Sequence, residues 1–288
     1  MINKINYREG LKKLIDKFVI ERFHYESNIL SSNTLSIFIE NIYALVRGKK
    51  VRFAYDQKLK LFLAKEKGLV KYNSEKFRCF WLYRDGIKTR GKFIFNSYRL
   101  NNINFNGNDL IVDCGANSGD LFIELEKFIK PKNYIAIEPN PADYKSLKFN
   151  CKGSHLIKKG LGDKNTIKEF FTSTNFADSS IIEPKYFEKI IKVKLIKFDD
   201  LINELNIKRI KLLKIEAEGY EPEVLLGAKE KLSICEYIAI DGGYERGVNE
   251  EQTFTQITNY LINRNFELCD IYFPWYRGLF KNKKTLIH

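Results

Sequence analysis

The amino-acid sequence predicts an α/β protein with a doubly wound, largely parallel sheet that follows an N-terminal helical and mixed cap. From residue 109 onward, short apolar runs alternate with segments whose apolar residues recur at helical spacing. This alternation is typical of parallel sheets covered by helices on both faces. Before residue 100 the pattern is less regular and begins with helical spacing. We therefore expect a cap over residues 1–100 and a second domain over residues 101–288.

The cap is predicted to combine helices with short strands. Residues 9–23 carry an apolar stripe at helical spacing, and residues 56–68 open with a capping aspartate and close on a glycine, so both segments predict helices. The aromatic-rich segments 77–83 and 91–100 favour strands or extended connections. The first helix could pack on the core, lie on a membrane surface or pair with a second copy. Substrate recognition, peripheral membrane contact and a homo-oligomer therefore stay open for the cap.

The second domain is predicted to alternate strands with helices along its whole length. We expect strands within residues 110–115, 133–139, 155–163, 167–173, 192–198, 209–219 and 235–243, with a closing segment over 266–280. We expect helices within residues 121–130, 142–150, 221–232 and 250–265. The third of these begins with a proline near its first position, where a missing N–H leaves no hydrogen bond unmade.

The composition favours a globular protein of the cytoplasm. The chain has 288 residues, 44% of them apolar, and contains no apolar run long enough to span a membrane and no apolar secretory leader at its start. A net charge of +13 would attract anionic partners, but the lysines are spread along the chain and form no basic run of five or more. We therefore do not expect nucleic acid as a partner. The five cysteines show no CxxC spacing, which indicates reduced core thiols rather than a zinc site or a disulfide scaffold.

A compact glycine turn follows the first strand of the second domain. In DCGANSG, Gly115 and Gly119 permit backbone conformations and close approaches that a side chain would block, and Asp113 lies two places before the first glycine. A dinucleotide site would instead use G-x-G-x-x-G to hold a pyrophosphate at a helix N-terminus. An acidic residue beside the glycine repels phosphate and suits a cation. The turn therefore favours S-adenosylmethionine, which carries an ammonium and a sulfonium and no phosphate.

A carboxylate at the end of the second strand supports the same cofactor. Glu138 ends the stretch YIAIE, where dinucleotide enzymes place the acid that binds the ribose hydroxyls. Asp163, in the turn after the third strand, could accept a hydrogen bond from the adenine amino group or could be an ordinary turn residue. We expect a methyl donor rather than a nicotinamide cofactor.

Several motifs resemble the FkbM family of S-adenosylmethionine-dependent methyltransferases. The matching stretches are IVDCGANSGD, YIAIEPNPADYKSLKFN, GLGDK, LIKFDDLI and LLKIEAEGYEPEVLLGAKEKL. The resemblance implies a Rossmann-like class I methyltransferase fold and methyl transfer to oxygen, commonly to a sugar or polyketide hydroxyl. By its motif positions, it implies that the cofactor contacts Asp113, Gly115, Asn117, Gly119, Glu138 and Asn140.

The chain departs from the family pattern at two positions. Glu216 stands where the family usually has an aspartate, and the strand that follows ends in IAIDGGYERG where many members end in a glutamate. Residues 1–100 carry little of the resemblance, so the choice of substrate does not follow from it.

Four charged residues at the ends of two strands are candidates for catalysis. Methyl transfer to a hydroxyl requires alignment and a group that accepts the hydroxyl proton. Lys214, Glu216 and Glu218 alternate on one face of an extended segment, and Asp241 ends the neighbouring strand. They could act as base or substrate contact, or they could form a salt-bridge network that ties the strand to the next helix. These carboxylates could also bind Mg²⁺, although the sequence does not require a metal.

Two further polar residues are candidates for binding the acceptor. Arg246 could hold a carboxylate or phosphate with its planar guanidinium, or pair with Glu245 or another acid. Ser180, in the polar stretch FADSSI, could close over the cofactor or merely form a turn.

The sequence thus predicts a cytoplasmic O-methyltransferase that acts on a hydroxyl of a sugar or glycan precursor in surface polysaccharide biosynthesis. One alternative is an RNA or other nucleic-acid methyltransferase, in which Phe80, Trp81 and Tyr83 would stack on bases. Others are a non-catalytic protein that retains the fold, and a nicotinamide-dependent sugar oxidoreductase.

Overall fold

The computed structural model describes residues 32–173 and 179–286. The chain divides into two compact units, Met1–Ile87 and Lys88–His288, so the boundary lies earlier than residue 100, where the sequence analysis places it. The helix predicted over residues 9–23 lies outside the described residues.

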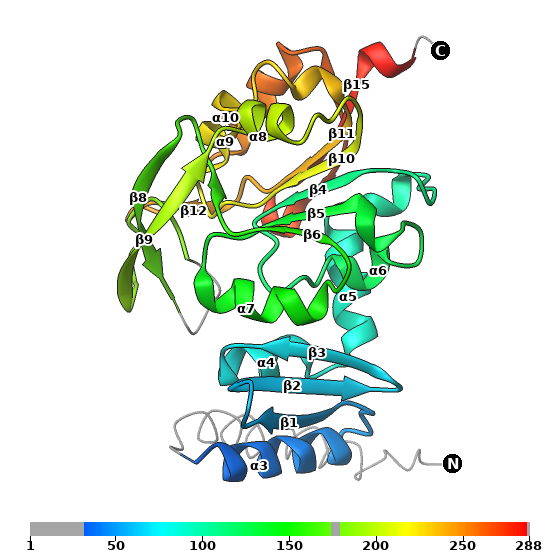
Figure 1. The fold of residues 1–288 in the computed structure, drawn as a ribbon, viewed down its shortest axis with the longest axis vertical. Helices are drawn as coiled ribbons and strands as arrows, with labels where there is room; N and C mark the ends of the chain where they lie inside the picture. The colour runs from blue at the N-terminus through cyan, green and yellow to red at the C-terminus, as the bar shows by residue number, and fades with distance from the viewer. Residues whose placement is uncertain (1–31, 174–178, 287–288) are drawn as a thin grey trace, which may run out of the picture. The chain divides into compact units, whose positions relative to one another are not determined.

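The first unit contains a three-stranded antiparallel sheet in the order β1–β2–β3. Its strands span Arg52–Asp56, Leu61–Glu66 and Leu69–Asn73, and its helices span Asn33–Val46 (α3) and Lys76–Tyr83 (α4) (Figure 1). The N-terminus of α3 is capped by Ser32, whose side chain accepts a hydrogen bond from the Leu35 N–H. Asn41 ties α3 to β1, because its amide both donates to and accepts from the Phe53 backbone.

The helix predicted over residues 56–68 is wrong, because β1, β2 and their turns occupy this segment. Asp56 caps a turn rather than a helix, since its carboxylate accepts a hydrogen bond from the Leu59 N–H at 2.8 Å. Lys67 and Gly68 both have positive φ, which suits the two-residue turn that joins twisted antiparallel strands. The first four residues of β2, from Leu61 to Ala64, are consecutively buried, which a strand covered on both faces allows.

The strands predicted over residues 77–83 and 91–100 are also wrong, because these segments form α4 and α5 (Ile87–Ser97). Their aromatic residues favour strands, but the buried apolar side chains of α5 recur at helical spacing, at Ile87, Ile94 and Phe95. The period of burial therefore overrides the preference of the individual residues.

The second unit is built on a seven-stranded sheet in the order β14–β15–β11–β10–β4–β5–β6. Five neighbouring strands are parallel: β4 (Ile111–Cys114), β5 (Tyr134–Ile137), β6 (His155–Ile157), β10 (Ile210–Ile215) and β11 (Cys235–Ile240). β15 (Arg277–Asn282) is antiparallel to both of its neighbours, β11 and β14 (Phe266–Tyr272). This is the Rossmann-like α/β fold of class I methyltransferases, and it confirms the predicted fold class.

Helices cover both faces of this sheet (Figure 1). α5, α6 (Phe122–Leu125) and α7 (Pro141–Asn150) contribute to the apolar core on one face. α8 (Phe198–Glu204), α9 (Glu221–Leu226) and α10 (Phe254–Ile262) contribute to the core on the other. Single 3₁₀ turns span Leu100–Asn102, Pro131–Asn133, Leu232–Ile234, Phe273–Trp275 and Lys283–Leu286. Because both faces are covered, the central strands are buried on both sides.

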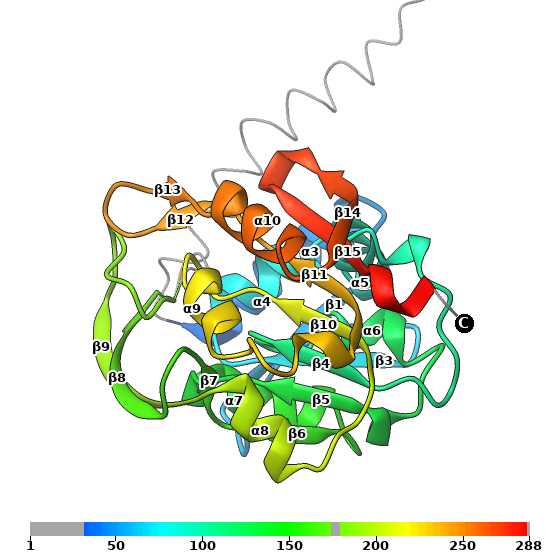
Figure 2. The same ribbon diagram turned by 90° about the horizontal axis from the view of Figure 1, so that it is seen from above.

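Two smaller sheets lie at one end of the main sheet (Figure 2). β9 (Lys189–Ile196) pairs with β7 (Gly160–Leu161) and β8 (Thr166–Thr172), while β12 (Tyr244–Arg246) pairs with β13 (Glu251–Gln252). In the main sheet the chain order reverses between β4 and β10. Ligands of doubly wound sheets bind outside the carboxyl ends of the strands at this switch point.

Two expectations from composition can be compared with the described residues. No helix described in the structure is both long and apolar enough to cross a membrane. All five cysteines are free. Four of them are buried as expected, but Cys269 is exposed and is therefore not a core thiol.

Candidate functional site

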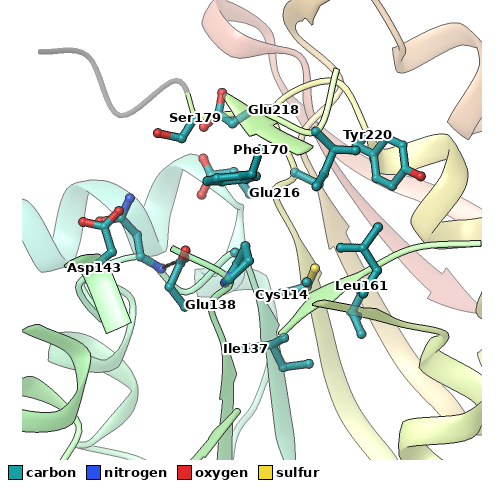
Figure 3. Close-up of a pocket in the computed structure, with 17 residues that line it drawn as sticks. Cys114, Ile137, Glu138, Asp143, Leu161, Phe170, Ser179, Glu216, Glu218 and Tyr220 are labelled. Carbon is teal, nitrogen blue, oxygen red and sulfur yellow. Dashed lines mark hydrogen bonds between the residues drawn. The ribbon is translucent and has the colours of Figure 1, made fainter. Parts of the chain in front are cut away.

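A cavity lies at the switch point, where β4, β5 and β10 end. Its remaining walls come from β7, β8 and β9 and from the segments that follow β8 and β10. In Figure 3, Glu138 and Asp143 lie on one side of the cavity, and Leu161 and Tyr220 lie on the opposite side. Its lining combines apolar side chains with a few polar ones, as is typical of sites that bind small ligands.

The charged side chains that line the cavity are all acidic. Glu138, Asp143, Glu216 and Glu218 line it, and the described residues that line it include no lysine, arginine or histidine. Carboxylates gathered in one cavity repel phosphate and attract a cation. The electrostatic field of the site therefore favours a positively charged ligand.

The Glu138 carboxylate is held in place by the backbone around it. The Asn117 N–H donates a hydrogen bond to one oxygen and the Asn140 N–H donates to the other, each at 2.8 Å. The Glu138 side chain is nearly buried, so these bonds fix its orientation at the edge of the cavity. Asn140 itself does not line the cavity, because its side chain caps α7 by accepting from the Ala142 N–H.

The two glycines of the turn are needed mainly for packing against protein atoms. Gly115 has a φ of +71°, and a Cβ there would lie 1.9 Å from the Glu216 carbonyl oxygen. At Gly119, which has a φ of +86°, a Cβ would lie 2.4 Å from the Cys151 sulfur. Gly115 lines the cavity and Gly119 does not, so the predicted ligand contact of Gly119 gains no support from its position.

Lys214 and Asp113 form an ion pair behind the glycine turn. The Lys214 ammonium lies 3.1 Å from Asp113 and 2.9 Å from Glu216, and it donates to the Gly115 carbonyl at 2.8 Å. The Tyr134 hydroxyl donates to the other oxygen of Asp113. Neither Lys214 nor Asp113 lines the cavity. In this position Lys214 and Asp113 hold the glycine turn in place from behind and do not face the cavity.

Two cations hold the Glu216 carboxylate in its ionised form. One oxygen lies 2.9 Å from Lys214, and the other lies 2.6 Å from the Arg277 guanidinium. Burial alone would raise the pKa of Glu216, but Lys214 and Arg277 together lower it to about 2. Burial likewise would lower the pKa of Lys214, but Asp113 and Glu216 raise it above its usual range. Glu216 is therefore a poor proton acceptor, and Lys214 stays charged.

Arg277 also binds Asp241, at the end of β11. The Arg277 Nε donates to Asp241 at 2.6 Å, and a terminal nitrogen donates to the Ser97 hydroxyl at 2.8 Å. Asp241 is fully buried and does not line the cavity. Burial raises the pKa of Asp241, although Arg277 opposes this shift. Its position gives it no access to a ligand in the cavity.

Glu218 lines the cavity at the end of β10, and its backbone conformation is unusual. Its φ is +51°, a left-handed conformation that is uncommon for glutamate. The Ser180 hydroxyl donates to the Glu218 carbonyl at 2.7 Å, and the Glu221 carboxylate accepts from the N–H groups of Ala217 and Gly219. Ser180 is buried and absent from the lining, whereas Ser179 lines the cavity. Ser180 therefore anchors the residue beside the cavity instead of facing a ligand.

Asp163 and Arg246 both pair with side chains of this region. Asp163 accepts a hydrogen bond of 3.4 Å from the hydroxyl of Tyr220, which lines the cavity. Arg246 binds both oxygens of Glu223 and donates to the Gly219 carbonyl at 2.6 Å. Arg246 thus pairs with Glu223 and not with Glu245, and it does not line the cavity. These contacts leave its predicted role as an acceptor-binding residue without support.

Residues 113–268 match the family model of the methyltransferase FkbM domain. The chain belongs to the FkbM methyltransferase family. A curated relative from Beauveria bassiana (strain ARSEF 2860), named Methyltransferase 1, is 25% identical over an alignment of 152 residues that covers 44% of this chain and 61% of that protein.

Two solved structures also resemble this FkbM-family chain. The methyltransferase FkbM from Methylobacillus flagellatus KT has 14% sequence identity and a TM-score of 0.45, over 91% of this chain and 58% of that one. Fibrillarin from Aeropyrum pernix, with natively bound S-adenosyl-L-methionine, has 10% identity and a TM-score of 0.42, over 80% of this chain and 98% of that one. The chain thus spans less than two thirds of the length of both the B. bassiana and the M. flagellatus proteins.

Among the residues of the site that sequence reasoning on this family member missed, two are charged. Arg277 is the counter-ion of both Glu216 and Asp241. The sequence could have indicated this role, because Arg277 lies inside an apolar closing segment and a buried charge requires a partner. Asp143 lines the cavity from the first turn of α7. An acid in the first turn of a helix is ordinary, so the sequence gave no separate signal for it.

Two further expectations for this family member are not supported. Phe80 and Tyr83 are fully buried in the first unit, and of the three aromatic residues proposed to stack on bases only Trp81 is exposed. Across residues 32–173 and 179–286, no group of three or more histidine, cysteine or acidic side chains is arranged to hold a metal ion. Mg²⁺ therefore does not enter the proposal below.

Proposed function

We propose that this chain is an S-adenosylmethionine-dependent O-methyltransferase that acts on a hydroxyl of a sugar or glycan precursor. The observation that carries the proposal is the cavity at the switch point, whose charged lining consists of four carboxylates and no cationic side chain among the described residues. Such a lining suits the ammonium and sulfonium of a methyl donor and opposes the pyrophosphate of a dinucleotide. Membership of the FkbM family supports the same donor.

The residues present fit this donor at three points. Glu138, oriented by two backbone N–H groups, would accept hydrogen bonds from the ribose hydroxyls. Leu161 and Phe170 would pack on the adenine ring, and both line the cavity together with Tyr220. Glu216 and Glu218 would face the positive charge. When bound, S-adenosylmethionine would supply a methyl group on a positively charged sulfur that keeps the bonding electron pair as the methyl leaves.

Glu218 is the residue that we assign to proton removal from the acceptor. Glu216 has a pKa of about 2 and is bound by two cations, so it is too weak a base. Asp241 and Lys214 do not reach the cavity. Glu218 lines the cavity and is positioned by Ser180 and Glu221 through its own turn. In the proposed reaction the acceptor oxygen bonds to the methyl carbon while Glu218 takes the hydroxyl proton.

Calorimetric titration with S-adenosylmethionine, S-adenosylhomocysteine and NAD tests the cofactor assignment. We expect S-adenosylmethionine to bind more tightly than S-adenosylhomocysteine, whose sulfur carries no charge, and NAD not to bind. Glu138→Ala should weaken binding at least about tenfold, because it removes hydrogen bonds to a charged acceptor. Glu204→Ala, at an exposed position of α8, is the matched control and should change nothing. Selective binding of NAD would overturn the proposal.

Glu218→Gln tests the assignment of the base. Turnover is measured as release of S-adenosylhomocysteine with neutral sugars as acceptors. The variant should bind S-adenosylmethionine like the wild type and turn over at least about a hundredfold more slowly. Unchanged turnover would remove Glu218 as the base. If the wild type binds the donor but releases no product with any acceptor, the non-catalytic alternative is favoured.

A further inference from the structure

The helix α3 exposes a row of large apolar side chains on the first unit. Five of its residues are between 45% and 63% exposed, namely Leu35, Phe38, Ile42, Leu45 and Val46. Their spacing of three, four, three and one residues places them on one face of the helix. Single exposed apolar residues are normal on a protein surface, but a contiguous row of them indicates a binding surface. We call these five residues the α3 stripe.

The opposite side of α3 faces the protein and is small or polar. Its buried residues are Ser36, Glu40 and Ala44, which recur every four residues. The Ser36 hydroxyl accepts a hydrogen bond from the Lys76 ammonium at 3.2 Å, and Asn41 bonds to the backbone of β1, which lies beside α3 in Figure 1. A surface helix of a water-soluble protein normally turns its apolar face inward. The orientation of α3 is the reverse, so packing within the described residues does not explain the α3 stripe.

A group of basic residues follows the α3 stripe directly. The helix ends where Gly48, with a φ of +67°, reverses the chain, and the Lys49 N–H donates to the Ala44 carbonyl. Four cations lie within six residues here, without an acid between them: Arg47, Lys49, Lys50 and Arg52. Three of them are exposed and Lys49 is half-buried. We call these four residues the basic segment.

Much of the charge of the basic segment is not balanced by acids. Asp85 lies 2.8 Å from the Lys49 ammonium and 3.9 Å from the Arg47 guanidinium. The Arg52 guanidinium donates to backbone carbonyls, which are neutral acceptors. Residues 32–87 contain twelve lysines and arginines and five acids, so they carry +7 of the net charge of +13 in about a fifth of the chain. The positive charge is therefore concentrated in the unit that carries the α3 stripe.

An apolar face with a cationic rim matches the surface of an anionic bilayer. The apolar side chains of an interfacial helix enter the boundary between headgroups and acyl chains, and nearby lysines and arginines bind anionic headgroups. A second copy of the chain fits less well, because the α3 stripe has five residues and stable interfaces use about 20–30 residues on each side. Nucleic acid would pair with the basic segment but would leave the apolar side chains in water.

We propose that α3 binds the surface of a bilayer that contains anionic phospholipids, with the α3 stripe among the outer parts of the acyl chains and the basic segment against the lipid phosphates. With 14 residues, α3 is too short to span a bilayer and would lie in the plane of its surface. The inference goes beyond the proposed function and does not depend on it, because no residue of α3 or of the basic segment lines the cavity.

Flotation of the full-length chain with lipid vesicles tests the proposal. The probes are vesicles of phosphatidylcholine alone and vesicles in which about a quarter of the lipid is phosphatidylserine. We expect binding to the anionic vesicles to be at least about tenfold tighter than binding to the neutral ones, and to weaken as salt rises above about 0.15 M. Absence of binding to the anionic vesicles, or equal binding to both kinds, would overturn the proposal.

Two substitutions in the α3 stripe locate the contact. Phe38→Ser combined with Leu45→Ser removes its two most exposed side chains and should weaken binding to the anionic vesicles at least about tenfold, because less apolar surface leaves water. The matched control combines Ile167→Ser with Tyr186→Ser, at comparably exposed positions of the second unit, and should bind like the wild type. Unchanged binding by the Phe38 and Leu45 variant would refute the assignment of the contact to α3.

Two substitutions in the basic segment test its contact with the lipid phosphates. Lys50→Gln combined with Arg52→Gln should weaken binding to the anionic vesicles about tenfold. The control combines Lys168→Gln with Lys192→Gln, at exposed positions of β8 and β9, and should have no effect. An equal loss in both variants would show that net charge alone attracts the chain, which would overturn the role of the basic segment.

Measurements without lipid distinguish a bilayer from other ways of covering the α3 stripe. We expect the Phe38 and Leu45 variant to keep the oligomeric state of the wild type in sedimentation velocity and to melt within a few degrees of it. A dimer that this variant dissociates would assign the α3 stripe to a second copy, and a large drop in melting temperature would assign it to residues 1–31 of the same chain. Either result would overturn the proposal. The variant should bind S-adenosylmethionine like the wild type, so a failure of the bilayer contact leaves the proposed function intact.

Discussion

Replacing Arg277 by methionine should destabilise the protein strongly at neutral pH. The substitution keeps most of the side-chain volume but removes the cation that Asp241 and Glu216 share. Asp241 is fully buried, and breaking a buried pair by removing one partner costs about 3–5 kcal/mol. Glu216 would keep Lys214 as a partner. We therefore expect a loss of about 3–5 kcal/mol, a large part of the stability of an ordinary domain.

The loss should shrink as the pH falls. Without Arg277, burial is the largest influence left on Asp241, so its pKa in the folded state lies well above its value in the unfolded chain. A group whose folded pKa is raised binds a proton more tightly in the folded state, so it stabilises the fold below the unfolded pKa and loses that contribution as the pH rises through the folded pKa. The variant should therefore recover stability between about pH 7 and pH 4 relative to the wild type.

Chemical denaturation followed by circular dichroism at several pH values measures this effect. Arg209→Met is the matched control, because Arg209 pairs with Glu236 at the surface and its side chain is 76% exposed; its loss should stay below about 1 kcal/mol. Adding Asp241→Asn to Arg277→Met should restore part of the stability, because the amide carries no charge. An Arg277→Met variant within about 1 kcal/mol of the wild type, or one whose deficit does not depend on pH, would refute this account of the network.

Three further changes probe the same edge of the sheet. Gly115→Ala would bring a Cβ to 1.9 Å from the Glu216 carbonyl, so it should abolish S-adenosylmethionine binding in calorimetry; retained affinity would show that the turn tolerates a shift. Ser180→Ala removes the hydrogen bond to the Glu218 carbonyl and should lower the free energy of unfolding by about 1 kcal/mol. It should reduce turnover more than it reduces affinity for the methyl donor. Equal reductions of turnover and affinity would contradict a positioning role. Burial and the neighbouring Asp241 raise the pKa of Glu221 to about 7, so Glu221 contributes stability that is lost as the pH rises through 7. Glu221→Gln should therefore flatten the dependence of stability on pH between about pH 5 and pH 8. An unchanged slope would show that another group causes this pH dependence.

The sequence predicted the fold of the second unit because the central parallel strands there are buried on both faces. The sequence segments that form β4, β5, β10 and β11 are almost continuously apolar. Such segments between helices are typical of parallel strands covered on both faces. In the first unit the same reasoning failed. Local composition misidentified residues 56–68 and 77–83, where turn conformations and the period of burial decided the structure.

The candidate site was predictable where it depends on chain order and not where it depends on tertiary contacts. The end of a strand fixes where its next residue lies, and Gly115, Glu138 and Glu218 line the cavity. Their contacts with a ligand stay predictions. Whether an acid at a strand end faces the ligand or an internal cation depends on distant residues. Arg277, 61 residues after Glu216, determines that Glu216 is held ionised and that Asp241 faces inward.

The charge of the site is opposite in sign to the charge of the chain. The net charge is +13, yet the acids that line the cavity are accompanied by no lining cation among the described residues, and the nearest cations, Lys214 and Arg277, are bonded to acids. Exposed lysines farther away than the Debye length of about 8 Å contribute little to the potential at such a site. A partner of the cavity is therefore selected by the local carboxylates, which favour a cationic donor, and the overall basic charge acts only on what approaches the rest of the surface.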